Sequence, residues 1–123
     1  MILVDTSVWI DHLHKSESGL VGLLEQAQVC IHPMIIGELA LGSLRNRSVI
    51  LELLADLPGI PTATHSEVLH LVESRTLYGL GLGLVDAHLL ASLRLAGNYQ
   101  LWTRNPRLHA AAPGLAVVAD LAM

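Results

Sequence analysis

Short apolar runs alternate along the chain with longer stretches in which apolar side chains recur every three or four residues. The short runs predict buried strands, and the longer stretches predict helices that turn one apolar face to a core. We expect strands at residues 2–4, 29–31, 60–63, 100–103 and 116–118. We expect helices from residue 6 to about 13, at 20–27, 33–44, 50–57, 65–77 and 85–96, and in a turn that begins at residues 105–106.

Strands that alternate with helices favour an α/β fold, in which a central, mostly parallel β-sheet is flanked by helices as an α/β/α sandwich. The length of 123 residues suits a single domain over residues 1–123. In parallel sheets, sites form at the carboxyl ends of the strands. The residues that follow each strand-forming run are therefore the first candidates for chemistry.

Three acidic residues stand where the pattern favours an apolar or neutral side chain. Asp5 ends the first apolar run, and Glu38 is the only charged residue between positions 33 and 44, where we expect it to face apolar surroundings. Asp86 opens a helix whose apolar residues lie three, four and seven positions later, so it shares their face. Each acid also has an ordinary alternative role, respectively a helix cap, a surface charge and a partner of the helix dipole.

Taken together, the three carboxylates indicate a metal site. Isolated buried carboxylates are costly, so several that converge near strand ends need a cation. Oxygen ligands without cysteine or histidine favour a hard ion, Mg²⁺ or Mn²⁺. Such an ion can activate water and neutralise a phosphodiester in its transition state.

At these residues the chain resembles the PIN-domain nucleases, and most of all the VapC toxins. VDTSVWIDHL, the helix around Glu38, GLVDAHLLAS and LWTRNPRLHA match the four successive motifs of the family in order and spacing. The resemblance implies a PIN-like fold and a Mg²⁺-dependent endoribonuclease that cleaves RNA by metal-activated water and so inhibits translation and growth. It also implies that Asp5, Glu38 and Asp86 are both the catalytic and the metal-binding residues.

The resemblance extends to supporting residues. A hydroxyl beside the first acid, here Thr6 or Ser7, assists in the family, as does Thr103. The family usually has a fourth acid where this chain has Asn105. The Asn105 carbonyl oxygen can still orient a water on the metal, but it brings no charge. We therefore expect one firmly held ion rather than two.

A net charge of −4 argues against binding of nucleic acid through a basic face. In a metal nuclease this objection weakens, because the acids hold a cation that supplies positive charge. Four arginines are candidate contacts to RNA phosphates, with a solvated surface charge as the alternative for each: Arg45, Arg47, Arg104 and Arg107. Aromatic residues are few, and both tryptophans lie in apolar segments, so base stacking on an aromatic platform is not expected.

Hydrophobic residues make up 52% of the chain and the mean hydropathy is +0.53, which is high for so short a sequence. Either the core is unusually rich or a partner covers apolar surface. The resemblance implies a cognate antitoxin and a homodimer. The single cysteine, the absence of a signal-peptide pattern and the absence of an apolar stretch of ~20 residues favour a cytoplasmic protein that contacts no membrane.

Other function classes fit less well. An aspartate-nucleophile phosphatase or receiver-like domain would use Asp5, but Ser7 replaces the usual second acid and Lys15 is the only lysine. A PIN-like module that only binds a partner is compatible with Asn105, although the three retained acids argue against it. The glycines at 79, 81 and 83 follow a helix and lack a Gly-Lys-Ser/Thr sequence, which favours a turn over a phosphate loop. The histidines form no zinc motif.

Overall fold

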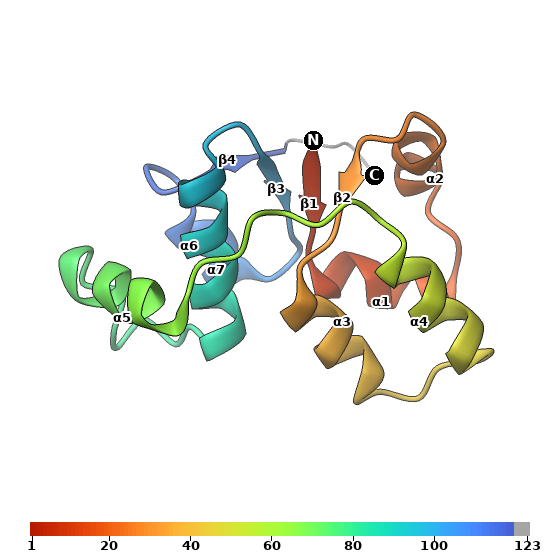
Figure 1. Ribbon diagram of the computed structural model, residues 1–123, viewed down its shortest axis with the longest axis horizontal. Helices are drawn as coiled ribbons and strands as arrows, with labels where there is room; N and C mark the ends of the chain where they lie inside the picture. The colour runs from red at the N-terminus through yellow and green to blue at the C-terminus, as the bar shows by residue number, and fades with distance from the viewer. Residues whose placement is uncertain (120–123) are drawn as a thin grey trace.

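The computed structural model describes residues 1–119, which form a four-stranded parallel sheet and seven helices (Figure 1). The strands are β1 (Ile2–Val4), β2 (Val29–Cys30), β3 (Gln100–Trp102) and β4 (Val117–Val118). The helices are α1 (Thr6–His14), α2 (Ser18–Glu25), α3 (Pro33–Ala40), α4 (Arg47–Ala55), α5 (His65–Ser74), α6 (Leu84–Ala96) and α7 (Pro106–Ala111). The predicted α/β class with a parallel sheet is confirmed.

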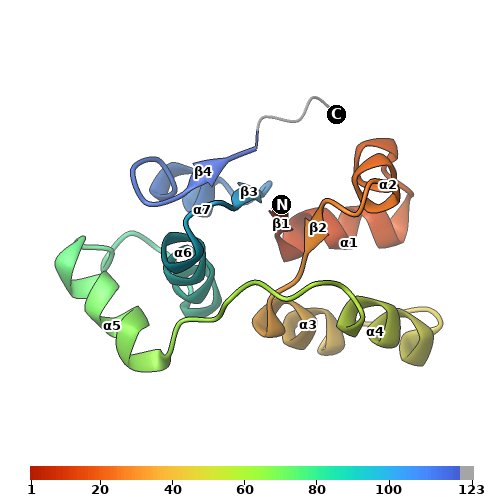
Figure 2. The ribbon, with the colours of Figure 1, turned by 45° about the horizontal axis from the view of Figure 1, so that its top comes forward.

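The sheet has the order β2-β1-β3-β4, and every pairing is parallel. The connection from β1 to β2 and the longer one from β2 to β3 run in opposite directions across the sheet. Right-handed crossovers therefore place their helices on opposite faces. Figure 2 shows α2 and α6 on opposite sides of the strands.

The parallel arrangement brings three strand ends to one edge of the sheet. Asp5 follows β1, Thr103 follows β3, and His32 lies just beyond β2. Figure 1 shows β1 pointing toward the first turns of α1 and α3. The edge that the sequence selects for chemistry is thus the edge where α1 and α3 begin.

The core lies around the central strand. Leu3 and Val4 of β1, Leu101 of β3, and Leu89 and Leu90 of α6 are completely buried. Burial of one such side chain contributes about 1.5–3 kcal/mol, so this cluster fixes α6 against the sheet. Both tryptophans, at positions 9 and 102, are also buried, as the sequence predicted.

The predicted strand at residues 60–63 is wrong. Only a single parallel bridge forms there, between Ile31 and Gly59. Ile60 donates its N–H to the Ile31 carbonyl (3.0 Å), but the next residue, Pro61, has no N–H with which to continue the ladder. The chain instead leaves the sheet and runs to the start of α5.

Four predicted helices end earlier in the structure, among them the helix predicted at 50–57, which is α4 and ends at Ala55. The helix predicted to reach residue 44 ends at Ala40, where the Arg47 guanidinium donates to the carbonyls of Ala40 and Gly42. The helices predicted to reach residues 27 and 77 end before Ala27 and Thr76, whose φ angles of 55° and 53° are left-handed. Leu77 is buried even though it lies outside α5.

No helix within residues 1–119 is both long and apolar enough to cross a membrane. The predicted single domain over residues 1–123 includes residues 120–123, which lie outside the described part of the chain.

Candidate active site

Asp5 is held by two hydroxyl groups from different parts of the chain. Its carboxylate is buried, although it stands at the start of α1, and it makes no side-chain capping bond to that helix. Its Oδ2 accepts hydrogen bonds from Ser7 Oγ (2.8 Å) and from Thr103 Oγ1 (2.7 Å). The simple helix-cap alternative for Asp5 is therefore wrong.

Backbone groups fix the direction of both hydroxyl hydrogens. The Arg104 N–H donates to Ser7 Oγ (2.9 Å), and the Asn105 N–H donates to Thr103 Oγ1 (3.0 Å). Because each hydroxyl oxygen already accepts an N–H, each points its own hydrogen at Asp5. Oδ2 is thus occupied twice, whereas no hydrogen bond within the described chain reaches Oδ1.

Asp86 lies in the first turn of α6 and is half-buried. Its Oδ2 accepts the Gly83 N–H (3.1 Å), so the helix-start alternative is real. Burial raises the pKa of Asp86, the Gly83 bond opposes that rise, and the nearby negative charge of Asp5 adds to it. Asp86 is thus near enough to Asp5 for the charge of Asp5 to contribute to its pKa.

Glu38 departs from the expectation of apolar surroundings. Its side chain is exposed. The apolar Leu41, which lies just past the end of α3, is itself 92% exposed. Glu38 Oε1 accepts a hydrogen bond from Thr6 Oγ1 (2.6 Å), which ties α3 to the residue next to Asp5. As placed, no three His, Cys, Asp or Glu side chains within residues 1–119 lie close enough together to hold a metal ion.

The predicted supporting residues all gather around these acids. Thr6 binds Glu38, while Ser7 and Thr103 bind Asp5. The Asn105 carbonyl oxygen caps α7, accepting the N–H groups of Arg107 (3.0 Å) and the following leucine (3.4 Å). The structural alternative for Asn105, a cap before Pro106, is therefore present.

Arg45 is exposed, and the other three candidate arginines differ in what they contact. Arg104 pairs with Asp11 (2.6 Å) and Glu17 (2.8 Å) and lies 5.7 Å from the ring centroid of Trp102. The Arg47 guanidinium binds carbonyls at the end of α3. That of Arg107 binds the Gly81 carbonyl (3.4 Å). Arg104 thus acts as an internal brace, and its predicted phosphate contact would require two ion pairs to break.

The PIN-domain family model matches residues 2–113, which include all three acids and their hydroxyl partners. The chain belongs to the PIN-domain family. Membership confirms the fold that the motifs implied and removes the support for a phosphatase or receiver-like domain.

Two curated relatives of this PIN domain carry the name ribonuclease VapC32. They come from the CDC 1551/Oshkosh and ATCC 25618/H37Rv strains of Mycobacterium tuberculosis. Each is 56% identical over 111 residues, which cover 90% of this chain and 90% of the relative. A solved chain described as part of DNA-bound VapBC from Salmonella typhimurium matches the fold with a TM-score of 0.71. Its sequence identity is 18%, and the match covers 94% of this PIN domain and 95% of that chain.

Sequence reasoning missed His32. This buried ring caps α3: its Nδ1 accepts the Met34 N–H (3.0 Å), and its Nε2 lies 3.1 Å from Ser92 Oγ. Because Nδ1 accepts, the neutral ring carries its hydrogen on Nε2 and donates to Ser92. His32 therefore links α3, which carries Glu38, to α6, which carries Asp86. Proline at the first position of a helix was the available signal, since it identifies the preceding residue as the cap.

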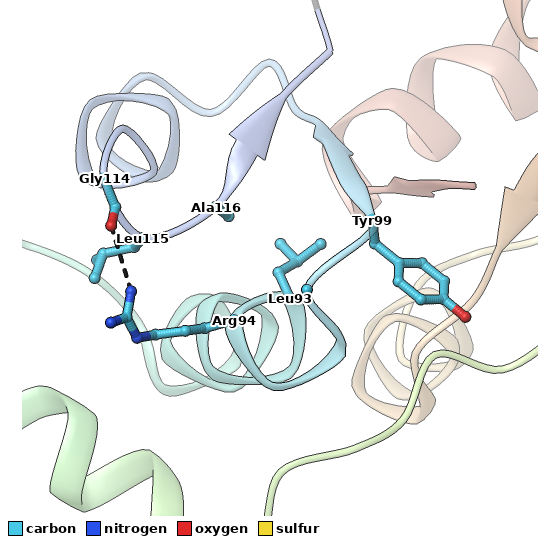
Figure 3. A pocket seen from close by; sticks show the side chains of 7 residues that line it. Leu93, Arg94, Tyr99, Gly114, Leu115 and Ala116 are labelled. Carbon is cyan, nitrogen blue, oxygen red and sulfur yellow. Dashed lines mark hydrogen bonds between the residues drawn. The ribbon is translucent and has the colours of Figure 1, made fainter.

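A surface hollow shown in Figure 3 lies away from the acids. Arg94, Tyr99, Gly114 and Leu115 are among its lining residues, which include no carboxylate. Arg94 donates to the Gly114 carbonyl across it (3.4 Å). Arg94 stands eight residues after Asp86 on α6, about 12 Å along the helix axis at 1.5 Å per residue. This hollow is separate from the candidate site.

Proposed function

We propose that this PIN domain is a Mg²⁺-dependent endoribonuclease and the toxin of a toxin–antitoxin pair, acting in the cytoplasm. Family membership and the identity to ribonuclease VapC32 support the ribonuclease activity. The observation that carries the site assignment is the arrangement of Asp5 and Asp86. One carboxylate is buried and oriented by two hydroxyls, and it acts electrostatically on the other.

Asp5 and Asp86 would hold the ion, with Glu38 as a third proposed ligand. Two carboxylates with open oxygens fit Mg²⁺ or Mn²⁺, because Mg²⁺ commonly takes one or two protein carboxylates and keeps several waters. The raised pKa of Asp86 beside Asp5 also fits, since a carboxylate pair of this kind is relieved by a cation. When bound, the ion supplies Lewis acidity that activates water and neutralises charge on the phosphodiester.

The remaining residues keep these acids in place. Ser7 and Thr103 occupy one oxygen of Asp5, which leaves Oδ1 as its open oxygen. Thr6 holds the Glu38 carboxylate beside the start of α1. Asn105 orders the turn that presents Thr103, both through its backbone N–H and by capping α7. These contacts hold the acids and the hydroxyl donors in position before the substrate binds.

The toxin role needs an apolar surface for an antitoxin. Ile10, Met34, Val49 and Leu53 are exposed on α1, α3 and α4, which lie side by side in both views (Figures 1 and 2). An antitoxin helix would bury such side chains and place a basic group near the acids. A homodimer would cover further apolar surface. A stable monomer at high concentration, with no growth defect on expression alone, would contradict both assignments.

The activity is tested with purified protein, freed of any partner, and defined structured RNAs. We expect internal cleavage in Mg²⁺ and none after chelation. Intact RNA under both conditions, with a folded protein by circular dichroism, would overturn the proposal and favour a PIN-like module that only binds.

A further inference from the structure

Arg107 connects the two segments that hold Asp5 and Asp86. It follows Thr103, which binds Asp5, by four residues, and its side chain reaches Gly81, two residues before the Gly83 that binds Asp86. The guanidinium thus joins the segment that binds Asp5 to the loop that binds Asp86. Arg107 is exposed, so a bound polymer could reach it.

The absence of a side chain at Gly81 leaves room for this arginine. A Cβ atom at position 81 would stand 3.0 Å from both Cδ and Nε of Arg107 and 3.1 Å from Cζ. Gly81 also has a φ of +79°, which side-chain-bearing residues rarely adopt. The arginine side chain therefore occupies the space that a Cβ at position 81 would need, and the absence of that Cβ lets it pack against the glycine backbone.

The charge of Arg107 is not neutralised within the described chain. Its guanidinium donates one hydrogen bond within the described chain, to the Gly81 carbonyl at 3.4 Å, and no carboxylate among residues 1–119 lies within 4.0 Å of its nitrogens. Arg104, by contrast, is paired with two carboxylates. A guanidinium has five donors in a planar fork that matches phosphate oxygens, so most of the donors of Arg107 remain for a ligand.

We propose that Arg107, laid against Gly81, is the residue that binds an RNA phosphate next to the one that is cleaved. The inference rests on the proposed ribonuclease activity and assigns the substrate backbone a specific contact at that site. It singles out one of the four candidate arginines. It also gives Gly81 a function in positioning Arg107, beyond its place in the turn before α6.

The test is the salt dependence of RNA binding by Arg107→Ala, Arg107→Lys and Gly81→Ala. A labelled RNA hairpin is titrated with each protein in Mg²⁺, in an Asp86→Asn background to suppress cleavage. Loss of one phosphate contact should weaken binding about five- to tenfold at low salt and reduce the slope of log affinity against log salt by ~0.7. Lysine should restore the slope, because it restores the charge. Gly81→Ala should weaken binding in the Arg107 protein but have little effect once Arg107 is alanine.

Arg75→Ala is the matched control, because Arg75 is an exposed arginine at the end of α5 outside the candidate site. It should leave the slope unchanged. An unchanged slope in Arg107→Ala, or an equal fall in Arg75→Ala, would overturn the assignment while RNA cleavage by the otherwise unmodified protein persists. Absence of RNA cleavage by that unmodified protein would instead overturn the proposed function.

Discussion

Thr103 donates its hydroxyl hydrogen to Oδ2 of Asp5 over 2.7 Å, joining residues 98 positions apart in the sequence. Thr103→Val keeps the side-chain volume but removes that donor and leaves the Asn105 N–H without its acceptor. We expect roughly tenfold lower kcat/KM, equivalent to about 1.4 kcal/mol, because a hydrogen bond to a charged group is lost. Steady-state RNA cleavage measures this loss. Thr103→Ser should restore most of the activity, and equal impairment by both variants would contradict a role for the hydroxyl.

Asp86→Asn should stabilise the metal-free protein. Burial and the charge of Asp5 raise the pKa of Asp86, so its charged form opposes folding at pH 7, and this cost is lost as pH falls through the raised pKa. The asparagine carbonyl can still accept the Gly83 N–H. Thermal unfolding in a chelator at pH 7 should show a higher Tm for Asp86→Asn.

Glu67→Gln supplies the control for that measurement. Glu67 occupies the same helical position in α5, but hydrogen bonds from Thr64 lower its pKa, so its charged form favours folding. Its replacement should give no increase in Tm. A fall in Tm for Asp86→Asn, or an equal rise for both variants, would contradict the carboxylate repulsion.

His32→Asn should reduce the fall in the free energy of unfolding between pH 7 and pH 4. Burial, with a smaller contribution from His88, lowers the pKa of His32 to about 4. As the pH falls, this histidine is therefore protonated in the unfolded chain at a higher pH than in the folded protein. Stability is therefore present above pH ~6.5 and falls as pH drops toward 4, by up to about 3 kcal/mol. Asparagine also caps helices but does not titrate. Urea unfolding of both proteins between pH 4 and 7 measures the difference, and parallel pH profiles would contradict the assignment.

Asn105→Asp should strengthen divalent binding, because a fourth carboxylate adds charge near the other acids. The cap on α7 should survive, since aspartate accepts the same N–H groups. Repulsion among the acids in the metal-free protein reduces the gain. Calorimetric titration with Mn²⁺ compares the two proteins. Identical affinity and stoichiometry would place Asn105 outside the metal site and leave it a structural cap.

Much of the fold was readable from local pattern. The apolar run before Asp5 predicted the end of β1, and the glycine after α6 predicted the end of that helix. Both predictions succeeded because a strand core and a left-handed helix end have strong residue preferences. The end of α3 was not readable, since its carbonyls are bound by Arg47 from the next helix. The false strand at 60–63 arose because apolar character alone does not reveal that Pro61 stops the ladder.

The candidate site residues could be selected from the sequence, but their geometry could be predicted less well. Asp5 and Asp86 were selected because they interrupt apolar faces, and in the structure burial raises the pKa of Asp86 and the charge of Asp5 adds to that rise. Glu38 was expected to face apolar surroundings, yet it is exposed, because α3 ends two residues later at Ala40 and the apolar Leu41 beyond it is itself exposed. The two backbone N–H groups that orient the hydroxyls on Asp5 have no sequence signature, since any non-proline residue supplies one.

The central claim is that Asp5 and Asp86 form the catalytic metal site. It is tested most directly by RNA cleavage in Mg²⁺ with three proteins side by side: the unmodified chain, Asp5→Asn and Asp86→Asn. Circular dichroism confirms that each is folded. The account predicts internal cleavage by the unmodified chain and no detectable cleavage by either variant. Cleavage at the unmodified rate by either folded variant would contradict it.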